Sequence, residues 1–277
     1  MPELPEVETI RSRLEPVLAG RRFERVVILD PLLTRPKPPA PVAAALEGER
    51  VAAVRRRGKY LIFAFASGRH LLVHLRMTGS FRHGANGSLE DDPHRRAVVS
   101  LDDGSDVSYR DVRRFGTWVV LEPDELDGYL EGKLGAEPLE RGFSATVLAR
   151  ALAGRRAPVK AVLLDQRAVA GGGNIYADEA LWLSGIHPAR PARGLDGEEV
   201  AALHRGVRRA LRVGIARQGA TLRDYRDPDG GAGAMQDELR VYGRDGKPCP
   251  RCKASVAKTR VAGRGTWFCP ACQAPPL

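Results

Sequence analysis

The chain has 277 residues, enough for one or two domains with a substantial core, and its net charge of +10 is unevenly distributed. Residues 1–140 carry 21 Lys and Arg against 22 Asp and Glu, whereas residues 141–277 carry 23 against 12. The basic C-terminal half therefore favours a polyanionic partner, with nucleic acid ranked before an anionic membrane. A basic surface without function is the competing interpretation. No apolar run approaches the ~20 residues of a membrane span and the acidic N-terminus lacks a signal-peptide pattern, so we expect a cytosolic protein without membrane association.

The first nine residues, MPELPEVET, offer a nucleophile without a side chain. If Met1 is removed, Pro2 presents a secondary amine that can attack an aldehyde-like carbon and form an iminium. At pH 7 roughly one α-amine in eight is neutral, against about one lysine in 2500, which favours the terminus as nucleophile. Glu3 is a candidate proton donor beside it. Pro5 predicts the first turn of a helix, and an ordinary capped surface helix would give the same pattern. The predicted buried face of this helix consists of Val7, Ile10 and Leu14.

Short β-like runs fill residues 22–121 and predict an antiparallel sandwich or barrel. They cover residues 23–29, 60–66, 70–75, 97–101 and 117–121, with Gly, Asp, Asn or Pro between them. The Pro-rich segment 35–41 is predicted to be a loop. Lys59 stands at the entry of the most apolar run, where the position alone predicts a solvated charge at a strand end.

Helical periodicity replaces the strands after a charged connection at residues 130–142. The predicted helices cover residues 144–153, 158–166, 174–184 and 197–217. Because helices follow strands without alternation, the order argues for two domains of different class.

Three glycines, Gly171 to Gly173, precede the third of these helices. Glycines let backbone amides approach a ligand closely, and a helix N-terminus favours a phosphate. Asn174 suits the N-cap, and Lys160 adds charge on the same side. A generic helix connection is the competing interpretation.

All four cysteines lie in the last 29 residues, as two CxxC pairs separated by sixteen residues. This spacing predicts one structural zinc ion held by four thiolates on a hairpin, because such a site leaves no open position for water. The predicted ligands are Cys249, Cys252, Cys269 and Cys272.

Together these motifs resemble the formamidopyrimidine-DNA glycosylases, bacterial repair enzymes for oxidised purines. The resemblance rests on MPELPEVET, on Gly58-Lys59-Tyr60, on residues 74–79, 111–116 and 159–179, and on the cysteines. It implies an α+β fold of an N-terminal antiparallel β-sandwich with a leading helix (1–134), a helical helix–two-turn–helix domain (135–240) and a zinc finger (241–277), with DNA in the cleft between domains. It implies a monomeric bifunctional DNA glycosylase and abasic-site lyase that acts on damaged duplex DNA in the bacterial cytosol or nucleoid.

The resemblance also implies roles for individual residues. Pro2 would be the nucleophile and Glu3 the proton donor, with Glu6 positioning the terminus. Lys59 and the hairpin-tip Arg264 would serve proton transfer and phosphate stabilisation. The space left by an extruded nucleotide would be entered by Met77, Arg113 and Phe115, which offsets part of the cost of extrusion. The residues that would face DNA phosphates are His94, Arg114, Arg156, Lys160 and Asn174.

The sequence departs from the family pattern at Val112, at Gly172, and at Ala234-Met235, where an aromatic pair is typical. The last departure keeps open an endonuclease VIII-like glycosylase for oxidised pyrimidines, although that group commonly begins Pro-Glu-Gly-Pro. The basic C-terminal half and the cysteine pairs would also suit a catalytically silent damaged-DNA-binding protein or a zinc-ribbon RNA-binding protein.

Overall fold

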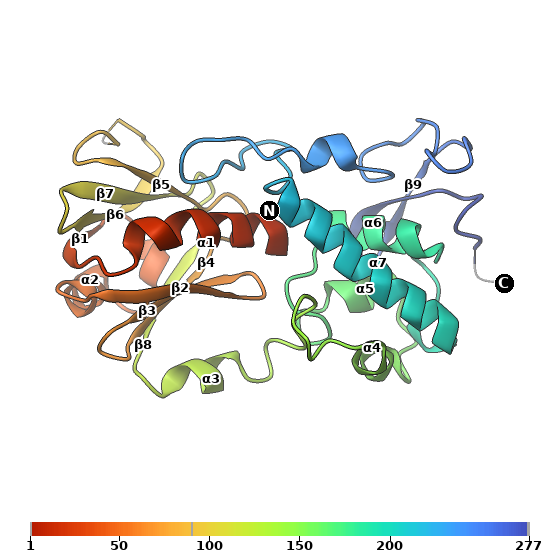
Figure 1. Cartoon of the computed structure of the whole chain (residues 1–277), viewed down its shortest axis with the longest axis horizontal. Coiled ribbons are helices and arrows are strands. Elements are labelled where there is room, and N and C mark those ends of the chain that lie inside the picture. The colour runs from red at the N-terminus through yellow and green to blue at the C-terminus, as the bar shows by residue number, and fades with distance from the viewer. Residues whose placement is uncertain (1, 90, 276–277) are drawn as a thin grey trace. The chain divides into compact units, whose positions relative to one another are not determined.

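A computed structural model describes residues 2–89 and 91–275 of the chain, which fold into two compact units (Figure 1). Unit 1 comprises Met1–Glu131 and Gln218–Ala234, and unit 2 comprises Gly132–Arg217 and Met235–Leu277. Segment 218–234 therefore folds with the N-terminal strands. The domain limits expected from the sequence, at 134/135 and 240/241, stay predictions.

Unit 1 contains two four-stranded antiparallel sheets, as the sequence predicted for its β-sandwich. One sheet has the order β1-β6-β7-β5, and the other has the order β2-β3-β4-β8. The strands are β1 (Phe23–Ile28), β2 (Val51–Arg57), β3 (Tyr60–Phe65), β4 (His70–His74), β5 (Ser80–Ala85), β6 (Arg95–Leu101), β7 (Ser105–Arg110) and β8 (Thr117–Leu121).

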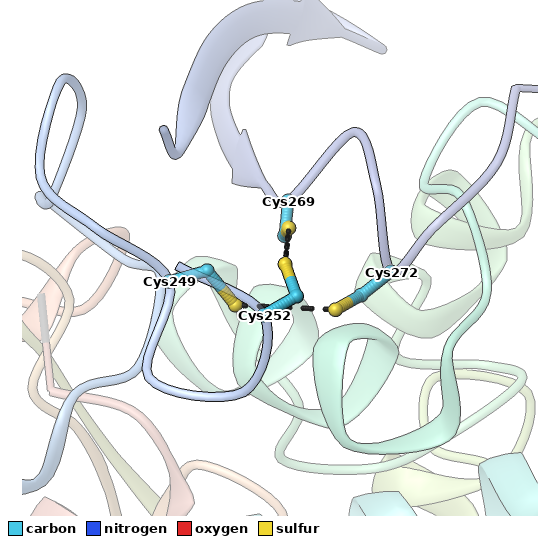
Figure 2. A group of neighbouring side chains, drawn as sticks. All are labelled: Cys249, Cys252, Cys269 and Cys272. Atoms are coloured by element: carbon cyan, nitrogen blue, oxygen red, sulfur yellow. Dashed lines mark hydrogen bonds between the residues drawn. The ribbon is translucent and has the colours of Figure 1, made fainter. Parts of the chain in front are cut away.

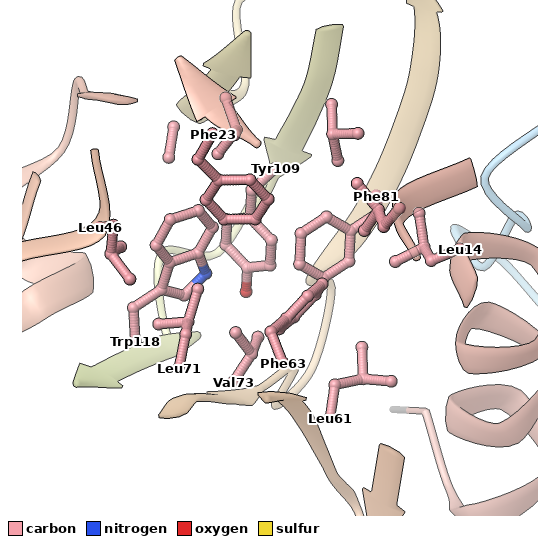
Figure 3. Close-up of a cluster of buried hydrophobic side chains, with 14 of the residues drawn as sticks. Leu14, Phe23, Leu46, Leu61, Phe63, Leu71, Val73, Phe81, Tyr109 and Trp118 are labelled. Carbon is pink, nitrogen blue, oxygen red and sulfur yellow. The ribbon is translucent and has the colours of Figure 1, made fainter. Parts of the chain in front are cut away.

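The apolar run of β3 is buried on both faces because two separate clusters cover its sheet. Leu61 and Phe63 point into the main core, whereas Ile62 belongs to a second cluster with Leu126 of α3 (Glu125–Leu130). This alternation follows from the two-residue period of a strand. The main core is rich in edge-to-face aromatic contacts, for example between Tyr109 and Trp118, whose ring centroids are 5.6 Å apart (Figure 3).

Two further helices close unit 1. Helix α1 (Leu4–Leu18) packs against β2 and β3 and buries Val7, Ile10 and Leu14 completely, which confirms the predicted apolar face. Helix α2 (Pro39–Leu46) begins inside the Pro-rich segment that the sequence predicted to be a loop. That prediction was wrong from residue 39 onward, because proline is well suited to the first turn of a helix, where its missing N–H has no intrahelical partner. A short 3₁₀ turn, η1 (Pro31–Thr34), precedes α2.

Unit 2 is helical and ends in a β-hairpin. Its helices are α4 (Ala145–Leu152), α5 (Val159–Leu164), α6 (Asn174–Ser184) and α7 (Gly197–Ala216), with 3₁₀ turns η2 (Ala192–Gly194) and η3 (Met235–Glu238). Strands β9 (Ala257–Val261) and β10 (Arg264–Phe268) pair antiparallel. Helix α6 packs along α7, and Gly206 permits their close approach because a Cβ there would lie 2.7 Å from the Ala180 carbonyl oxygen. Among the described residues, no helix has the length and apolarity that crossing a membrane requires.

Candidate active site

The start of α1 is a buried polar centre organised by the carboxylate of Glu6. Pro2 is buried, and Glu3, the N-cap residue of α1, is 3% exposed. One Glu6 oxygen, Oε2, accepts a hydrogen bond from the Glu3 backbone N–H at 2.8 Å. The other, Oε1, accepts one from the Ala220 backbone N–H at 2.7 Å. Hydrogen bonds to a buried carboxylate are strong, so Glu6 fixes the residue next to Pro2 and the base of segment 218–234 at once.

Segment 218–234 can approach α1 only because residue 219 is a glycine. Gly219 has φ +80°, and an added Cβ would lie 2.7 Å from Cγ of Glu6. Further along the segment, the Tyr225 hydroxyl lies 3.5 Å from the Glu6 carbonyl oxygen, and burial raises the pKa of Tyr225 well above its ordinary value. The His83 backbone N–H donates to the Pro228 carbonyl at 3.2 Å, so the segment is also held against β5.

Lys59 lies in the two-residue turn between β2 and β3 and is 6% exposed, so the solvated strand-end charge suggested by its position alone is not what the structure shows. Gly58 has φ +56°, a left-handed conformation that suits glycine in a tight hairpin turn. Arg56 connects this turn to α1: its Nε donates to Glu8 Oε2 at 2.9 Å, and its Nη1 donates to the Gly58 carbonyl at 3.0 Å. The turn with Lys59 is thereby anchored to the first turns of the helix that carries Pro2 and Glu3.

His74 is the titratable neighbour of Lys59 on the adjacent strand. It pairs with Tyr60 across β3 and β4, and their rings meet edge to face with centroids 4.7 Å apart. Burial, followed by the positive charges of Arg76 and Lys59, lowers the pKa of His74 to about 3. The imidazole is therefore neutral at physiological pH and adds no positive charge beside Lys59.

Two loops with predicted DNA-binding residues are joined by one buried carboxylate, that of Asp111. Thr78 donates its hydroxyl to Asp111 Oδ1, while the Gly116 backbone N–H donates to Oδ2 at 2.7 Å. The Arg113 backbone N–H in turn donates to the Thr78 hydroxyl at 2.9 Å. Asp111 is 1% exposed, so loops 75–79 and 111–116 form one rigid pair.

The tips of this loop pair are exposed. Phe115 is 52% exposed, and the Arg113 guanidinium lies 4.9 Å from its ring centroid. Met77 is half-buried on the neighbouring loop. An exposed phenylalanine beside a guanidinium is costly in water and suits insertion between bases.

His94 and Arg114 belong to the same region. The Asp111 backbone N–H donates to the His94 carbonyl at 3.0 Å. The Arg114 guanidinium holds Asp30 through two hydrogen bonds of 2.7 and 2.9 Å, and these bonds lower the pKa of Asp30. Arg114 thus forms an ion pair with Asp30 while its side chain stays 48% exposed, and its contact with a phosphate stays a prediction.

In unit 2, Lys160 does not present its charge at a surface, contrary to the expectation that it lies beside a phosphate. It is 0% exposed, and its ammonium lies 2.7 Å from Asp178 Oδ1. It also donates to the Thr266 hydroxyl at 2.8 Å and to the Gly265 carbonyl at 3.1 Å. Burial raises the pKa of Asp178 to about 7 although the Lys160 ammonium opposes the shift. An isolated buried ammonium is very unfavourable, which explains why the lysine is enclosed by three acceptors.

The same contacts position the hairpin that carries Arg264. Asp178 Oδ2 accepts the Trp267 backbone N–H at 3.0 Å, and Asn174 Nδ2 donates to the Gly265 carbonyl at 3.0 Å. Helices α5 and α6 therefore grip strand β10 by its backbone, and the adjacent Arg264 is exposed at the hairpin tip.

The glycine turn before α6 differs in detail from the prediction. Gly173, and not Asn174, is the N-cap of α6, because Asn174 already has helical conformation and directs its side chain to the hairpin. The Gln166 side chain holds the turn from both ends, accepting from Gly171 N–H and donating to the Gly172 carbonyl at 2.9 Å each. Arg156 is exposed upstream of α5.

The four cysteines fit a tetrahedral zinc site. Their sulfur atoms all lie within 4.8 Å of one another, with Cys252 and Cys269 at 3.4 Å and Cys249 and Cys272 at 3.9 Å (Figure 2). Zinc–sulfur bonds of ~2.3 Å in a tetrahedron require sulfur separations of about 3.8 Å. Burial opposes the ionisation of Cys249, but N–H donors that include the Cys252 backbone and Trp182 lower its pKa to about 6. The donor set thus suits the predicted zinc ion.

Sequence reasoning missed the buried acids that organise these sites. Glu179, 2% exposed, accepts the backbone N–H groups of residues 240–242 at 2.9 to 3.1 Å and fixes the chain that enters the zinc finger. The available signal was the pair Asp178-Glu179 within an otherwise apolar helical run. Asp111 gave no such signal, because it lies in a charged loop sequence.

Comparisons with known proteins agree with one another along the whole length of the chain. Three family models match: the formamidopyrimidine-DNA glycosylase N-terminal domain at residues 1–118, the H2TH domain of the same enzymes at 134–226, and a zinc finger found in FPG and IleRS at 246–275. The chain is 46% identical to a formamidopyrimidine-DNA glycosylase of Chloroflexus aggregans, over 99% of this chain and 98% of that protein. It is 47% identical to one of Symbiobacterium thermophilum, over 100% and 90%.

Solved structures agree. The Thermus thermophilus MutM (Fpg) protein is 44% identical with a TM-score of 0.88, and covers 100% of both chains. The complex between Lactococcus lactis Fpg and DNA containing an abasic site is 37% identical with a TM-score of 0.92, covering 99% of this chain and 100% of that one. The chain belongs to the formamidopyrimidine-DNA glycosylase family.

Proposed function

We propose that the chain is a bifunctional DNA glycosylase and abasic-site lyase that removes oxidised purines, 8-oxoguanine and formamidopyrimidines, from duplex DNA. The observation that carries the proposal is the anchored N-terminus: Glu6 fixes Glu3 beside Pro2, and Arg56 anchors the turn of Lys59 to the same helix. Once Met1 is removed, an amine at Pro2 beside the Glu3 carboxyl, with the turn of Lys59 anchored to the same helix, suits imine chemistry.

In the proposed reaction, the Pro2 nitrogen attacks C1′ of the extruded nucleotide, and the bond between C1′ and the base breaks. This role requires prior removal of Met1, because an amide nitrogen is not nucleophilic. Glu3 donates a proton to the sugar-ring oxygen as the ring opens, which leaves an iminium between Pro2 and C1′.

The iminium acidifies the C2′ proton. Loss of that proton expels the 3′ phosphate, and a second elimination expels the 5′ phosphate. We assign Lys59 to proton transfer and Arg264 to phosphate stabilisation in these steps. The neutral imidazole of His74 adds no positive charge next to Lys59.

We assign DNA recognition to the paired loops and to unit 2. Met77, Arg113 and Phe115 enter the space that the extruded nucleotide leaves, and His94 contacts the backbone nearby. In unit 2, Arg156 contacts phosphate from its exposed position upstream of α5, and the grip of Lys160 and Asn174 on β10 sets the hairpin against DNA. A zinc ion held by the four thiolates would fix the base of that hairpin. Such a protein acts on chromosomal DNA, so we place it in the cytosol or nucleoid.

Borohydride trapping tests the chemistry. The purified protein is incubated with borohydride and duplexes that contain 8-oxoguanine opposite cytosine, an oxidised pyrimidine, or no damage. We expect a covalent adduct chiefly with 8-oxoguanine, attached at Pro2 in peptide mass spectra. Lys59→Met should lower adduct formation, whereas the matched Lys37→Met, which alters an exposed lysine in the η1–α2 connection, should not.

Each outcome of the trapping experiment points to one activity. Preference for the oxidised pyrimidine would assign the chain to endonuclease VIII-like activity. An adduct at a lysine would refute the role of Pro2. Binding to damaged DNA without any adduct, with Met1 removed and zinc bound, would indicate a silent damage-binding protein.

A further inference from the structure

A basic groove on unit 2 takes no part in the proposed reaction. It lies along one face of α7 beside the end of α6 and has a volume of about 520 Å³. Its lining combines three arginines, Arg205, Arg209 and Arg212, with a floor and wall of Leu183, Ser184, Ala202, Gly206 and Val213. Residues 205, 209 and 212 follow the helical spacing of four and three, so the guanidinium groups share one side of α7.

The three arginines are exposed. Within residues 2–89 and 91–275, none of them has a carboxylate within ion-pair distance. The remaining arginine of α7, Arg208, differs. Arg208 donates to the carbonyls of Pro138 and Glu140 at 2.9 and 3.0 Å. Residues 200–217 contain four arginines besides Arg217 and no Asp or Glu, so the face has no internal counter-charge.

A fourth guanidinium contacts a residue that lines the groove. Arg251, from the zinc-binding loop, stacks 4.3 Å from the Trp182 ring centroid and contacts the carbonyl of Leu183 at 3.4 Å. Leu183 itself lines the groove. The positive charge therefore extends from α7 to the zinc finger.

The apolar floor decides between two kinds of polyanion. A DNA backbone could neutralise the arginines, but its deoxyribose C–H groups are interrupted by charged phosphates and give no continuous apolar face to cover Leu183, Ala202 and Val213. An amphipathic helix with carboxylates on its flanks fits both the arginines and the apolar floor. Its carboxylates bind guanidinium groups bidentately, and its apolar side chains fill the floor. We propose that this groove docks an acidic amphipathic segment of a partner protein.

The probe is a short fluorescein-labelled peptide, helical by design, with leucines at helical spacing and glutamates on both flanks. Anisotropy with the zinc-loaded full chain should show saturable binding. A scrambled peptide of the same composition, which keeps the charge but not the apolar face, should bind at least about tenfold more weakly. Val213→Gln, which removes floor apolarity without changing charge, should weaken binding of the ordered peptide alone.

The charge test uses Arg205→Glu, Arg209→Glu and Arg212→Glu together, with a matched triple reversal at Arg141, Arg150 and Arg193, which are exposed arginines of the same unit. The groove variant should lose at least about tenfold in peptide affinity, and the control less than about twofold. Single-turnover excision of 8-oxoguanine at saturating enzyme should persist in both, which separates this inference from the proposed function.

Equal binding of ordered and scrambled peptides, or equal losses in both triple variants, would overturn the proposal. So would an undamaged duplex that competes fully with the peptide for the groove and loses affinity only in the groove variant, since that result would identify a nucleic-acid surface instead.

Discussion

Replacing His74 with Asn should reduce the loss in free energy of unfolding that occurs as the pH falls below neutrality. The ordinary histidine pKa is 6.5, and the pKa of folded His74 is about 3. At pH values between these two pKa values, His74 binds a proton in the unfolded chain but not in the folded chain. The free energy of unfolding therefore falls as the pH falls. Asn does not titrate and retains an acceptor near the Arg76 backbone N–H, which now donates to His74 Nδ1 at 3.0 Å.

The magnitude follows from 1.36 kcal/mol per pH unit. At pH 5.5 the unfolded histidine is about nine-tenths protonated, which costs the folded state about 1.4 kcal/mol relative to pH 7.5. Urea unfolding should therefore show the wild-type protein losing about 1.4 kcal/mol more than His74→Asn between these two pH values. The loss of the ring contact with Tyr60 lowers the stability of the variant equally at both pH values, so it cancels from the comparison.

NMR provides an independent measurement of the same quantity. The carbon-bound ring proton of His74 should keep the chemical shift of a neutral imidazole throughout the range from pH 7.5 to 5.5. Equal pH dependence of the two proteins, or a His74 titration midpoint near 6.5, would refute the burial argument and the neutrality of the imidazole beside Lys59.

Three other perturbations test separate parts of the molecule. Lys160→Met should lower lyase activity more than damaged-DNA binding, because β10 loses the bonds of Lys160 to Gly265 and Thr266. The variant also leaves the Asp178 carboxylate without its cation. A double variant Lys160→Met with Asp178→Leu should therefore recover stability in thermal unfolding, and failure to do so would contradict the ion-pair account. Gly116→Ala should destabilise unit 1 by about 1–3 kcal/mol in denaturation, because its Cβ would lie 1.8 Å from the Tyr109 hydroxyl, and adding Tyr109→Phe should recover part of the loss. Removal of zinc by a chelator, or Cys252→Ser, should increase hydrogen exchange throughout β9 and β10, and unchanged exchange would show that the hairpin folds without metal.

Much of the fold could be predicted from local signals. Helix α6 was predicted with its bounds, and α1 with its buried face, because apolar residues recur at helical spacing in both. A proline also marks the start of α1. Strands β2, β5 and β7 were missed. Strand β7 places Asp106 and Ser108 between two neighbouring strands, where ladder hydrogen bonds to β5 and β6, and not side-chain apolarity, define the strand.

Some features of the candidate sites could also be predicted from the sequence, and others could not. The zinc ligands and the glycine turn could be found from spacing, because chemistry at these places requires fixed intervals along the chain. The partners of Lys160 could not, since Asp178 and Thr266 approach it from separate elements and no local pattern links them. The sequence assigned Lys160 to a phosphate contact, whereas the buried side chain binds the hairpin that contains β10.

The division of unit 1 into two stretches of chain has a consequence for biosynthesis. The ribosome completes residues 1–131 long before Ala220, yet the Glu6 carboxylate needs the Ala220 N–H as one of its partners. Until α4 to α7 have been synthesised, the Glu6 carboxylate of the nascent β-sandwich lacks this hydrogen-bond donor. The N-terminal nucleophile reaches its final surroundings only when most of the chain has been made, and a chain that stops before residue 220 lacks the backbone N–H that binds the Glu6 carboxylate.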